Sequence, residues 1–189
     1  MIVEGIVSTL DQTGSAHLSP MGPESGIIPG MFVLKPFQGS KTLANLQREG
    51  AGVFHILDDA LLLAQASVGL GNRISVDPAQ NVRGWVIPSA CRAWEFEIEE
   101  LDATQARSRI TCRVVREHTF RPFGGWNRAQ FAVMELAILY SRVGILLNEE
   151  ILQVIPSLEI LIQKTAGPRE LEAWKLLHGA LVERLEKNR

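Results

Sequence analysis

The chain has 189 residues, a length that fits one domain or one domain with an appendage. Its formal net charge of −2 argues against a protein that binds nucleic acid through bulk positive charge, and its two cysteines exclude a cysteine-rich zinc module or a disulfide scaffold. No signal peptide and no stretch of about 18 apolar residues is visible, so the sequence predicts a cytoplasmic protein that does not bind membranes.

Glycine and proline are spread unevenly along the chain. Thirteen of the 16 glycines precede residue 126, and six of the nine prolines precede residue 100. Because these residues mark turns, the front of the chain is predicted to be rich in turns and strands and the back to be helical. We therefore expect an α+β protein with a β-rich domain over 1–125 and a helical C-terminal subdomain of three segments over 126–189.

The first half of the chain predicts several strands and one short helix. Apolar and β-branched runs predict strands over 2–10, 16–20, 27–35 and 51–57. The turn residues between the first two runs predict a hairpin, and Pro29-Gly30 predicts a kink or bulge in the third. Strong helix formers predict a short helix over 59–68.

The clearest strand pattern lies over 91–118, where apolar and charged residues alternate. A hairpin that turns near Ala103-Thr104 would place Glu97 opposite Arg109 and Phe96 beside Ile110. Opposite charges that face each other across two strands stabilise the pair. The acidic run 95–99 is therefore interpreted as the solvated face of a hairpin and not as a metal or catalytic cluster.

The period changes to helical after Trp126. A helix is predicted over 127–147 with Asn127 as its N-cap, and a second over 149–165 that is interrupted near Pro156. Gly167-Pro168 is predicted to end one helix and begin the last. The apolar stripe of the last helix consists of Leu171, Trp174, Leu177, Leu181 and Leu185.

Common catalytic patterns are missing from the sequence. There is no Gly-x-Ser-x-Gly motif and no P-loop, and Gly69-Leu70-Gly71 is interpreted as a turn. The four histidines are dispersed without metal-ligand spacing, so no metal site is predicted. His55 lies in an apolar strand and is interpreted as a hydrogen-bonded structural residue.

Two segments stand out as a candidate anion site. In the first, Ala16–Pro23, a strand runs into a Pro/Gly turn; in the second, Leu34–Leu46, a strand ends and a helix begins near Ser40. The N–H groups of a first helical turn lack intrahelical partners, and the Ser40 and Thr42 hydroxyls and the Lys41 ammonium group add donors. This combination favours a phosphate, although Ser40 could instead serve only as an N-cap.

These two segments, followed by Gly52-Val53-Phe54-His55-Ile56-Leu57, resemble the FMN-binding split-barrel proteins of the flavin reductase-like superfamily. The resemblance covers roughly residues 1–120. Within the superfamily, the sequence is similar to an uncharacterised branch that has a helical C-terminal region after an Asn-Arg-Ala segment, here Asn127-Arg128-Ala129. It implies a six-stranded antiparallel split β-barrel with short helices. Pro20-Met21-Gly22-Pro23 stands where the better-known reductases have Ser-Phe-x-Pro-Pro, and no residue is assigned to a nicotinamide.

The resemblance also implies roles for particular residues in binding FMN. Ser19, Pro20, Met21 and Gly22 would border the flavin ring. Ser40, Lys41 and Thr42 would bind the phosphate, and Asn45 the ribityl or phosphate oxygens. Lys35 and Phe37 would lie beside the ring or the ribityl chain.

The aromatic and basic segment 120–128 leads into a predicted helix N-terminus. Trp126, Asn127 and Arg128 would close over the flavin, in their own or a neighbouring subunit, because proteins of this kind resemble one another in forming homodimers. The alternative is a domain junction with packed aromatic residues.

The preferred hypothesis is an oxidoreductase that uses bound FMN as its redox centre and takes an unidentified small-molecule substrate, with His17 and Trp126 as candidates for the substrate face. The catalytic residues stay unknown, because the flavin itself would supply the chemistry. One alternative is a non-catalytic carrier or sensor of a flavin or pterin-like ring. Another is an interaction module without a cofactor.

Overall fold

The computed structural model describes residues 1–25 and 29–188, and the chain divides into two compact units. The barrel unit comprises residues 1–57 and 74–123, and the helical unit comprises residues 58–73 and those from 124 onward. The two units interleave along the chain, whereas the sequence predicts two consecutive domains that meet at residue 125. The first two residues of the strand predicted over 27–35 lie outside the described residues.

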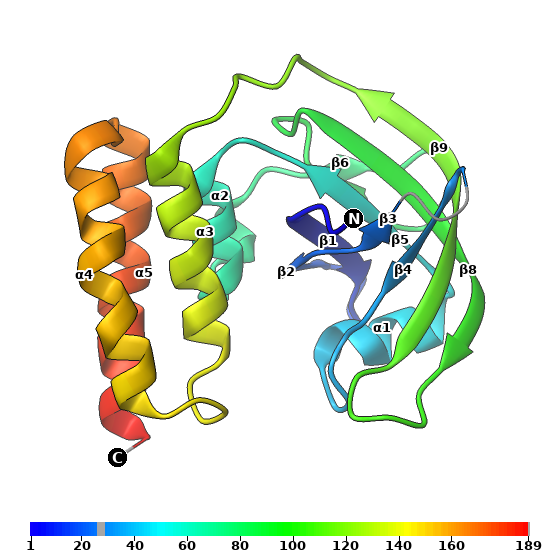
Figure 1. The fold of residues 1–189 in the computed structure, drawn as a ribbon. Helices are drawn as coiled ribbons and strands as arrows, with labels where there is room; N and C mark the ends of the chain where they lie inside the picture. Colours follow the sequence, from blue (N-terminus) through cyan, green and yellow to red (C-terminus); the bar gives the residue numbers. More distant parts are fainter. Residues whose placement is uncertain (26–28, 189) are drawn as a thin grey trace. The chain divides into compact units, whose positions relative to one another are not determined.

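The barrel unit is built on a curved antiparallel sheet (Figure 1). Within the described residues its seven strands follow the order β2-β1-β5-β8-β9-β4-β3. Their bounds are β1 Gly5–Leu10, β2 Ala16–Met21, β3 Glu24–Ser25, β4 Met31–Leu34, β5 Ala51–Ile56, β8 Arg92–Asp102 and β9 Arg109–Thr119. This architecture confirms the predicted α+β class. The seventh strand exceeds the six predicted because β3 has two residues, too few to leave a periodic pattern.

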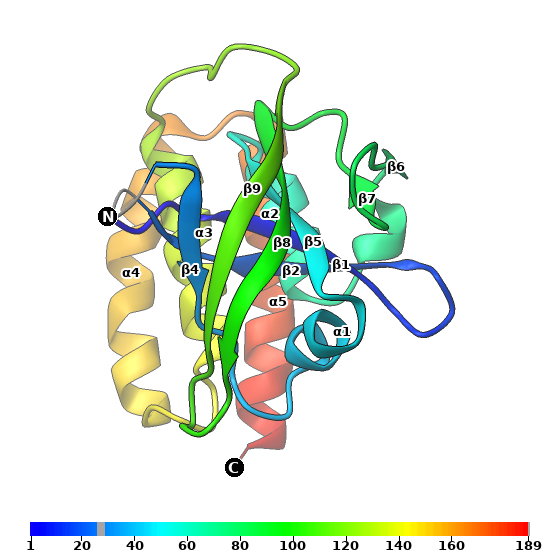
Figure 2. The same ribbon diagram turned by 90° about the vertical axis from the view of Figure 1, so that its right-hand side faces the viewer.

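A short helix and a two-stranded ribbon complete the barrel unit. Helix α1 (Lys41–Glu49) ends at Gly50, whose φ of 68° is left-handed, and it packs against β1 and β5 (Figure 2). The ribbon pairs β6 (Asp77–Pro78) with β7 (Trp85–Val86). One apolar core joins α1 to the sheet and consists of Val7, Phe32, Leu34, Leu43, Leu46, Phe54, Phe96, Ile110 and Cys112.

The β8–β9 hairpin exists as predicted, but its predicted register is wrong. Glu97 pairs with Arg113 and Phe96 with Val114, because the connection spans residues 103–108 and two irregularities shift the ladder. The guanidinium group of Arg113 lies 2.8 Å from the carboxylate of Glu97 and also contacts Glu99. Cross-strand charge pairing therefore occurs, with a different arginine from the one expected.

Glu95 departs from the interpretation of the acidic run as a solvated face, because its side chain is fully buried. Its carboxylate accepts hydrogen bonds from three successive backbone N–H groups of residues 80–82, at 2.9, 2.6 and 3.0 Å. Nε2 of His118 lies 2.7 Å from the same carboxylate. The segment between β6 and β7 is thus attached to the outer face of the sheet.

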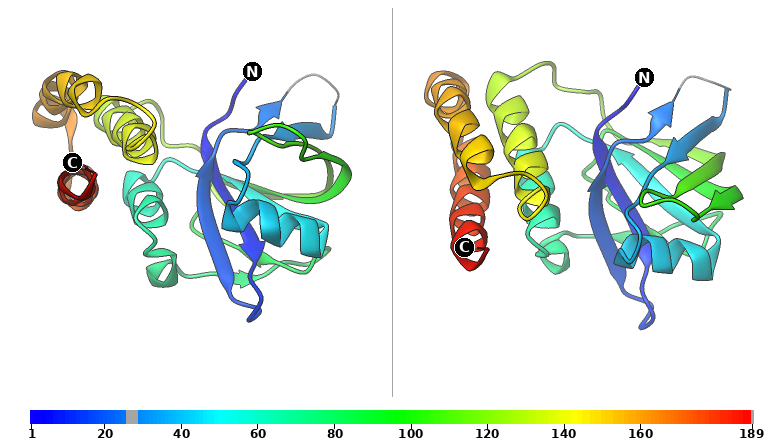
Figure 3. Two further views of the ribbon diagram at one scale, coloured as in Figure 1. Left: turned by 90° about the horizontal axis from the view of Figure 1, so that it is seen from below. Right: turned by 60° about the horizontal axis from the view of Figure 1, so that its bottom comes forward.

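The helical unit contains α2 (Ala60–Ser67), the 3₁₀ turn η1 (Gly71–Arg73), α3 (Arg128–Ser141), α4 (Asn148–Thr165) and α5 (Pro168–Lys187). The left view of Figure 3 looks nearly along α4 and α5. Helix α3 packs against α2, α4 and α5, and α2 also packs against α5. Asn127 caps α3 and Pro168 begins α5, as predicted.

Three details of these helices differ from the sequence-based expectation. Helix α3 ends at Ser141 and not at residue 147. Helix α4 continues through Pro156, because buried Ile155 and Leu158 hold both halves in the unit while the proline itself is exposed. Leu171 is 41% exposed, so it lies outside the buried stripe of α5.

Across residues 1–25 and 29–188, no helix combines the length and the apolar character needed to cross a membrane.

Candidate functional site

The N-terminus of α1 is the centre of the candidate site. Ser40 is the N-cap, and its hydroxyl accepts a hydrogen bond from the N–H of Leu43 at 3.2 Å. The N–H of Ala44 donates to the Ser40 carbonyl. In the described part of the chain the N–H groups of Lys41 and Thr42 have no acceptor, as expected for a first helical turn. Two donors are therefore available at this end of α1.

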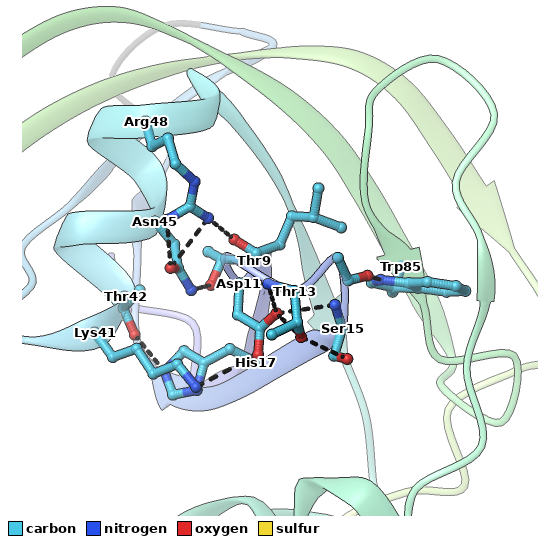
Figure 4. A network of polar contacts seen from close by, with 12 residues as sticks. Thr9, Asp11, Thr13, Ser15, His17, Lys41, Thr42, Asn45, Arg48 and Trp85 are labelled. Atoms are coloured by element: carbon cyan, nitrogen blue, oxygen red, sulfur yellow. Dashed lines mark hydrogen bonds and ion pairs between the residues drawn. The ribbon is translucent and has the colours of Figure 1, made fainter.

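The turn between β1 and β2 brings a carboxylate to the same place (Figure 4). Oδ2 of Asp11 lies 3.6 Å from Nζ of Lys41. Oδ1 of Asp11 accepts hydrogen bonds from the Thr13 hydroxyl at 2.7 Å, the Thr13 N–H at 2.8 Å and the Ser15 N–H at 2.9 Å. Mainly through the Thr13 hydroxyl, and also through Ser15 and Lys41, these contacts lower the pKa of Asp11 to about 2. Asp11 is therefore an anion that faces Lys41 at neutral pH.

His17 reaches α1 from strand β2. Its Nε2 lies 3.2 Å from the hydroxyl oxygen of Thr42. Burial, followed by the positive charge of Lys41, lowers the pKa of His17 below its ordinary value of 6.5. The imidazole is consequently neutral at pH 7, and Lys41 is the cation that the first turn of α1 offers to an anion.

Asn45 and Thr42 are buried parts of this network, with exposures of 2% and 3%. The side-chain amide of Asn45 donates to the hydroxyl of Thr9 at 2.9 Å and accepts from Arg48 at 3.3 Å. The guanidinium group of Arg48 also donates to the carbonyl of Leu10. These bonds attach α1 to β1 and fix the position of the first turn.

The predicted ring-binding segment 19–22 runs along the last strand of the sheet. Ser19, Pro20 and Met21 pair with Val7, Ile6 and Gly5 of β1. All four residues of segment 19–22 are half-buried, and Pro23, which follows the segment, is buried. His17 and Ser19 lie on the same face of β2, since side chains alternate along a strand. The contact between His17 and Thr42 therefore places this face of β2 beside α1.

Gly22 is packed too closely for any larger residue. A Cβ atom at this position would stand 2.6 Å from a methyl carbon of Ile2 and 2.8 Å from the carboxylate of Glu4. The absence of a side chain thus lets the N-terminal residues approach the end of β2.

Two other predicted residues make contacts elsewhere in the barrel unit. Nζ of Lys35 lies 2.5 Å from the carboxylate of Glu24 on β3. The ring of Phe37 lies under the guanidinium group of Arg107, at 4.2 Å from its centroid, and Phe37 forms a β-bridge with the same residue. Their predicted positions beside the flavin ring or ribityl chain stay predictions.

Trp126, Asn127 and Arg128 belong to the helical unit. The side chain of Asn127 accepts hydrogen bonds from the N–H groups of Ala129 and Gln130 and donates to the carbonyl of Thr165. It therefore has a structural role as the cap of α3. Trp126 is 99% exposed and Arg128 is exposed. Their proposed closure over a cofactor stays a prediction.

Three residues outside the predicted site organise the first turn of α1. Asp11 lies in the turn predicted between the first two strands, and an Asp followed two residues later by Thr is typical of a side chain that binds its own turn. Arg48 and Thr9 carry no comparable signal, because their contacts with Asn45 depend on how α1 packs against β1.

His55 has the structural role that the sequence indicates. Its Nε2 accepts a hydrogen bond from the N–H of Ile87 at 3.0 Å, and its Nδ1 lies 3.1 Å from the carbonyl of Ile6. Both nitrogens are thus engaged inside the barrel unit, and burial lowers the pKa of His55 to about 4.

Solved structures similar to this one contain the same fold. An FMN-bound protein from Methanosarcina mazei, of the family designated DUF447, is 21% identical and aligns over 95% of this chain and 94% of its own, with a TM-score of 0.81. An FMN-binding protein from Thermus thermophilus is 13% identical over 62% of this chain and 70% of its own, with a TM-score of 0.55. Nitrilotriacetate monooxygenase component B from Bacillus cereus is 15% identical over 63% and 70%, with a TM-score of 0.54. The predicted split-barrel fold is confirmed.

Sequence comparisons identify the family. No curated protein matches the chain significantly. The family model described as "Protein of unknown function (DUF447) N-terminal domain" matches residues 3–121, and that of "Protein of unknown function (DUF447)" matches residues 127–179. Together the two matches span both units, and the chain therefore belongs to the DUF447 family of proteins of unknown function.

Proposed function

We propose that this protein binds FMN on its barrel unit and uses the flavin as a redox centre. The observation that carries the proposal is the likeness, over 95% of the chain, to a protein of the same family that is FMN-bound. The first turn of α1 supports it, because two backbone donors and one ammonium group converge there.

The phosphate of FMN fits the exposed part of this turn. The N–H groups of Lys41 and Thr42 and the ammonium group of Lys41 would hold it, with Ser40 capping the helix. The buried side chains of Thr42 and Asn45 already have partners, so they would act by positioning the turn and not by contacting the phosphate. This refines the roles that the resemblance assigns to them.

The flavin ring would lie along the segment 19–22 of β2. The bound flavin would supply the electron or hydride chemistry, so that the protein need not provide a nucleophile. The chain would bind and orient the ring, and neutral His17 lies on the same face of β2 as Ser19. An oxidisable or reducible small molecule would stack on the exposed face of the ring.

Cofactor identity is tested by purifying the protein and analysing the small molecule released on denaturation. We expect a flavin absorbance spectrum and the mass of FMN, or tight binding of FMN added to the apoprotein. A colourless protein that binds neither FMN nor riboflavin would contradict the proposal.

Redox activity is tested separately on the flavin-loaded protein. Rapid bleaching of the flavin on mixing with NADH or NADPH in a stopped-flow instrument, followed by reoxidation with an acceptor, is the expected result. If FMN binds but neither nicotinamide nor another reductant of similar potential bleaches it rapidly, the protein is a carrier or sensor and the catalytic part of the proposal fails.

A further inference from the structure

His17 is a titratable side chain beside the proposed phosphate position. It is half-buried on β2, and its Nε2 lies 3.2 Å from the hydroxyl oxygen of Thr42 (Figure 4). The backbone N–H of Thr42 is one of the two first-turn donors that would hold the phosphate of FMN. His17 therefore contacts a residue of the proposed phosphate site from a different element of the barrel unit.

The charged groups around His17 come from two elements. Lys41 begins α1, and its Nζ lies 3.6 Å from Oδ2 of Asp11 in the β1–β2 turn. These two side chains act on His17 with opposite signs. Farther along α1, Arg48 is paired with Glu49, and β1 and β2 contain no Asp, Glu, Lys or Arg. The formal charges that face His17 from α1 and from the turn therefore cancel.

A bound phosphate monoester would change this balance. Its second pKa is about 6, so it carries nearly two negative charges at pH 7. Lys41 would compensate one of them, and Asp11 already faces the same ammonium group. The site would thus hold more negative charge than its resident side chains neutralise. A negative charge near an imidazole favours the protonated form of the ring.

The free protein disfavours that protonated form. Burial, followed by the positive charge of Lys41, lowers the pKa of His17 below 6.5, while Asp11 acts in the opposite direction. A phosphate that engages Lys41 would offset its repulsion of His17 and add an attraction. Both nitrogens of a protonated imidazole carry hydrogen, so Nε2 would donate to the hydroxyl of Thr42 and the existing contact would be kept.

We propose that His17 is a second cation of the phosphate site, which takes up one proton from solvent when a phosphate monoester binds at the first turn of α1. The inference rests on the proposed binding of FMN at this turn. Each unit by which binding raises the pKa of His17 makes the affinity about tenfold higher below the free pKa than above the bound one. The preference for FMN over riboflavin, which lacks the phosphate, should therefore increase as the pH falls.

Fluorescence titrations at two pH values give the first test. The ratio of the FMN affinity at pH 6.5 to that at pH 8.5 should be at least about threefold larger in the wild type than in His17→Gln. The glutamine amide can donate to Thr42 but cannot take up a proton. Protonation of the phosphate itself affects both proteins alike, so the comparison isolates His17. Equal ratios in the two proteins would overturn the proposal.

Two controls accompany these titrations. His178→Gln on α5, in the helical unit, is the matched variant and should keep the wild-type ratio. Riboflavin should give the same ratio with the wild type and with His17→Gln. A difference of the same size for riboflavin would assign the effect to the ring or to the fold of β2, and it would count against a role at the phosphate.

NMR titration of the imidazole signals gives a second test, carried out on the wild-type protein. Saturation with FMN should raise the pKa of His17 by at least about half a unit, whereas riboflavin should leave it unchanged. The signal of His178 serves as an internal reference. If FMN binds and the pKa of His17 does not rise, the inference fails while the proposed binding of FMN stands. If FMN does not bind at all, both are overturned.

Discussion

Asp11 has two contacts of opposite consequence for an anionic ligand. One carboxylate oxygen organises the β1–β2 turn through Thr13 and Ser15, and the other faces the ammonium group of Lys41. A phosphate bound at the first turn of α1 would therefore compete with the carboxylate of Asp11 for the ammonium group of Lys41.

The variant Asp11→Asn should raise the affinity for FMN by roughly two- to fivefold, since an exposed ion pair contributes little. Asparagine keeps the oxygen that accepts from the turn and removes the charge that faces Lys41. Affinity is measured by fluorescence titration. Riboflavin, which lacks the phosphate, should bind both forms equally; an equal gain for both ligands would point to the turn and not to the charge.

Glu95 is a residue on which the stability of the barrel unit depends. Replacement by Gln should lower the free energy of unfolding by about 1–3 kcal/mol, because the amide keeps one oxygen, and its NH2 group cannot accept the N–H groups of residues 80–82 that face the other carboxylate oxygen. Urea denaturation measures the loss. Glu99→Gln on the same strand, where the side chain is 41% exposed, is the control and should change stability much less.

The same residue predicts a pH dependence. Burial acts to raise the pKa of Glu95, but the N–H groups of residues 80–82 and His118 outweigh it and lower the pKa. The stabilisation is therefore complete above the unfolded pKa of about 4.3 and is lost as the pH falls through the lower folded value. Unfolding free energies measured between neutral and acidic pH should fall less steeply in Glu95→Gln than in the wild type. Parallel curves would contradict this assignment.

At the scale of elements, the close approach of β1 and β5 depends on a glycine. A Cβ atom on Gly5 would stand 2.2 Å from the carbonyl oxygen of His55 and 2.7 Å from the ring of Phe54. Gly5→Ala should lower stability by about 1–3 kcal/mol or more, because overpacking forces the strands apart. Gly179→Ala, in open space on α5, should instead raise it by about 0.5–1 kcal/mol. Thermal unfolding of both variants would show opposite shifts.

Substitutions of Ser40, the N-cap of α1, can distinguish its role in capping the helix from a role in binding an anion. Asn and Asp cap helices about as well as Ser, so Ser40→Asn and Ser40→Asp should both keep the stability of the wild type. Only Asp adds a negative charge beside the proposed phosphate position, and it should weaken FMN binding by at least about tenfold. Equal affinities for the two variants, measured by titration, would place the phosphate elsewhere.

Local signals in the sequence were sufficient for the elements whose ends have their own chemistry. Ser40, Asn127 and Pro168 begin helices as predicted, because caps and first-turn prolines act within a few residues. The register of the β8–β9 hairpin depends on two irregularities in the ladder, which leave no local pattern. The burial of Glu95 depends on a segment 13–15 residues away and could not be predicted from the alternating pattern.

At the scale of the whole molecule, the chain leaves the barrel unit at residue 58 and returns at residue 74. The excursion contains α2, whose buried residues include three consecutive leucines, Leu61–Leu63, and which packs against α3 and α5. Residues 58–73 contribute nothing to the candidate site, since β2 and α1 both belong to the barrel unit. The proposed FMN site is therefore built from the barrel unit.

A fragment of residues 1–125 should consequently aggregate, because α2 would lose the helices that cover its apolar side chains. Replacing 58–73 in this fragment by a Gly/Ser linker should yield a soluble barrel unit that gives a β-rich circular dichroism spectrum. Size exclusion distinguishes the two fragments. A soluble, monomeric 1–125 fragment with α2 intact would show that α2 does not need the later helices.

The interleaving of the two units also sets an order in time during synthesis. Pro168, where α5 begins, lies 101 residues beyond Ser67, where α2 ends. At about 5–20 residues per second, the ribosome needs roughly 5–20 s to reach α5, the later of the two helices that pack against α2. The last strand of the barrel unit, β9, ends at Thr119 and is therefore synthesised before α5 begins. During this interval the apolar side chains of α2 lack the cover that α5 provides, and nascent chains should then depend most on chaperones.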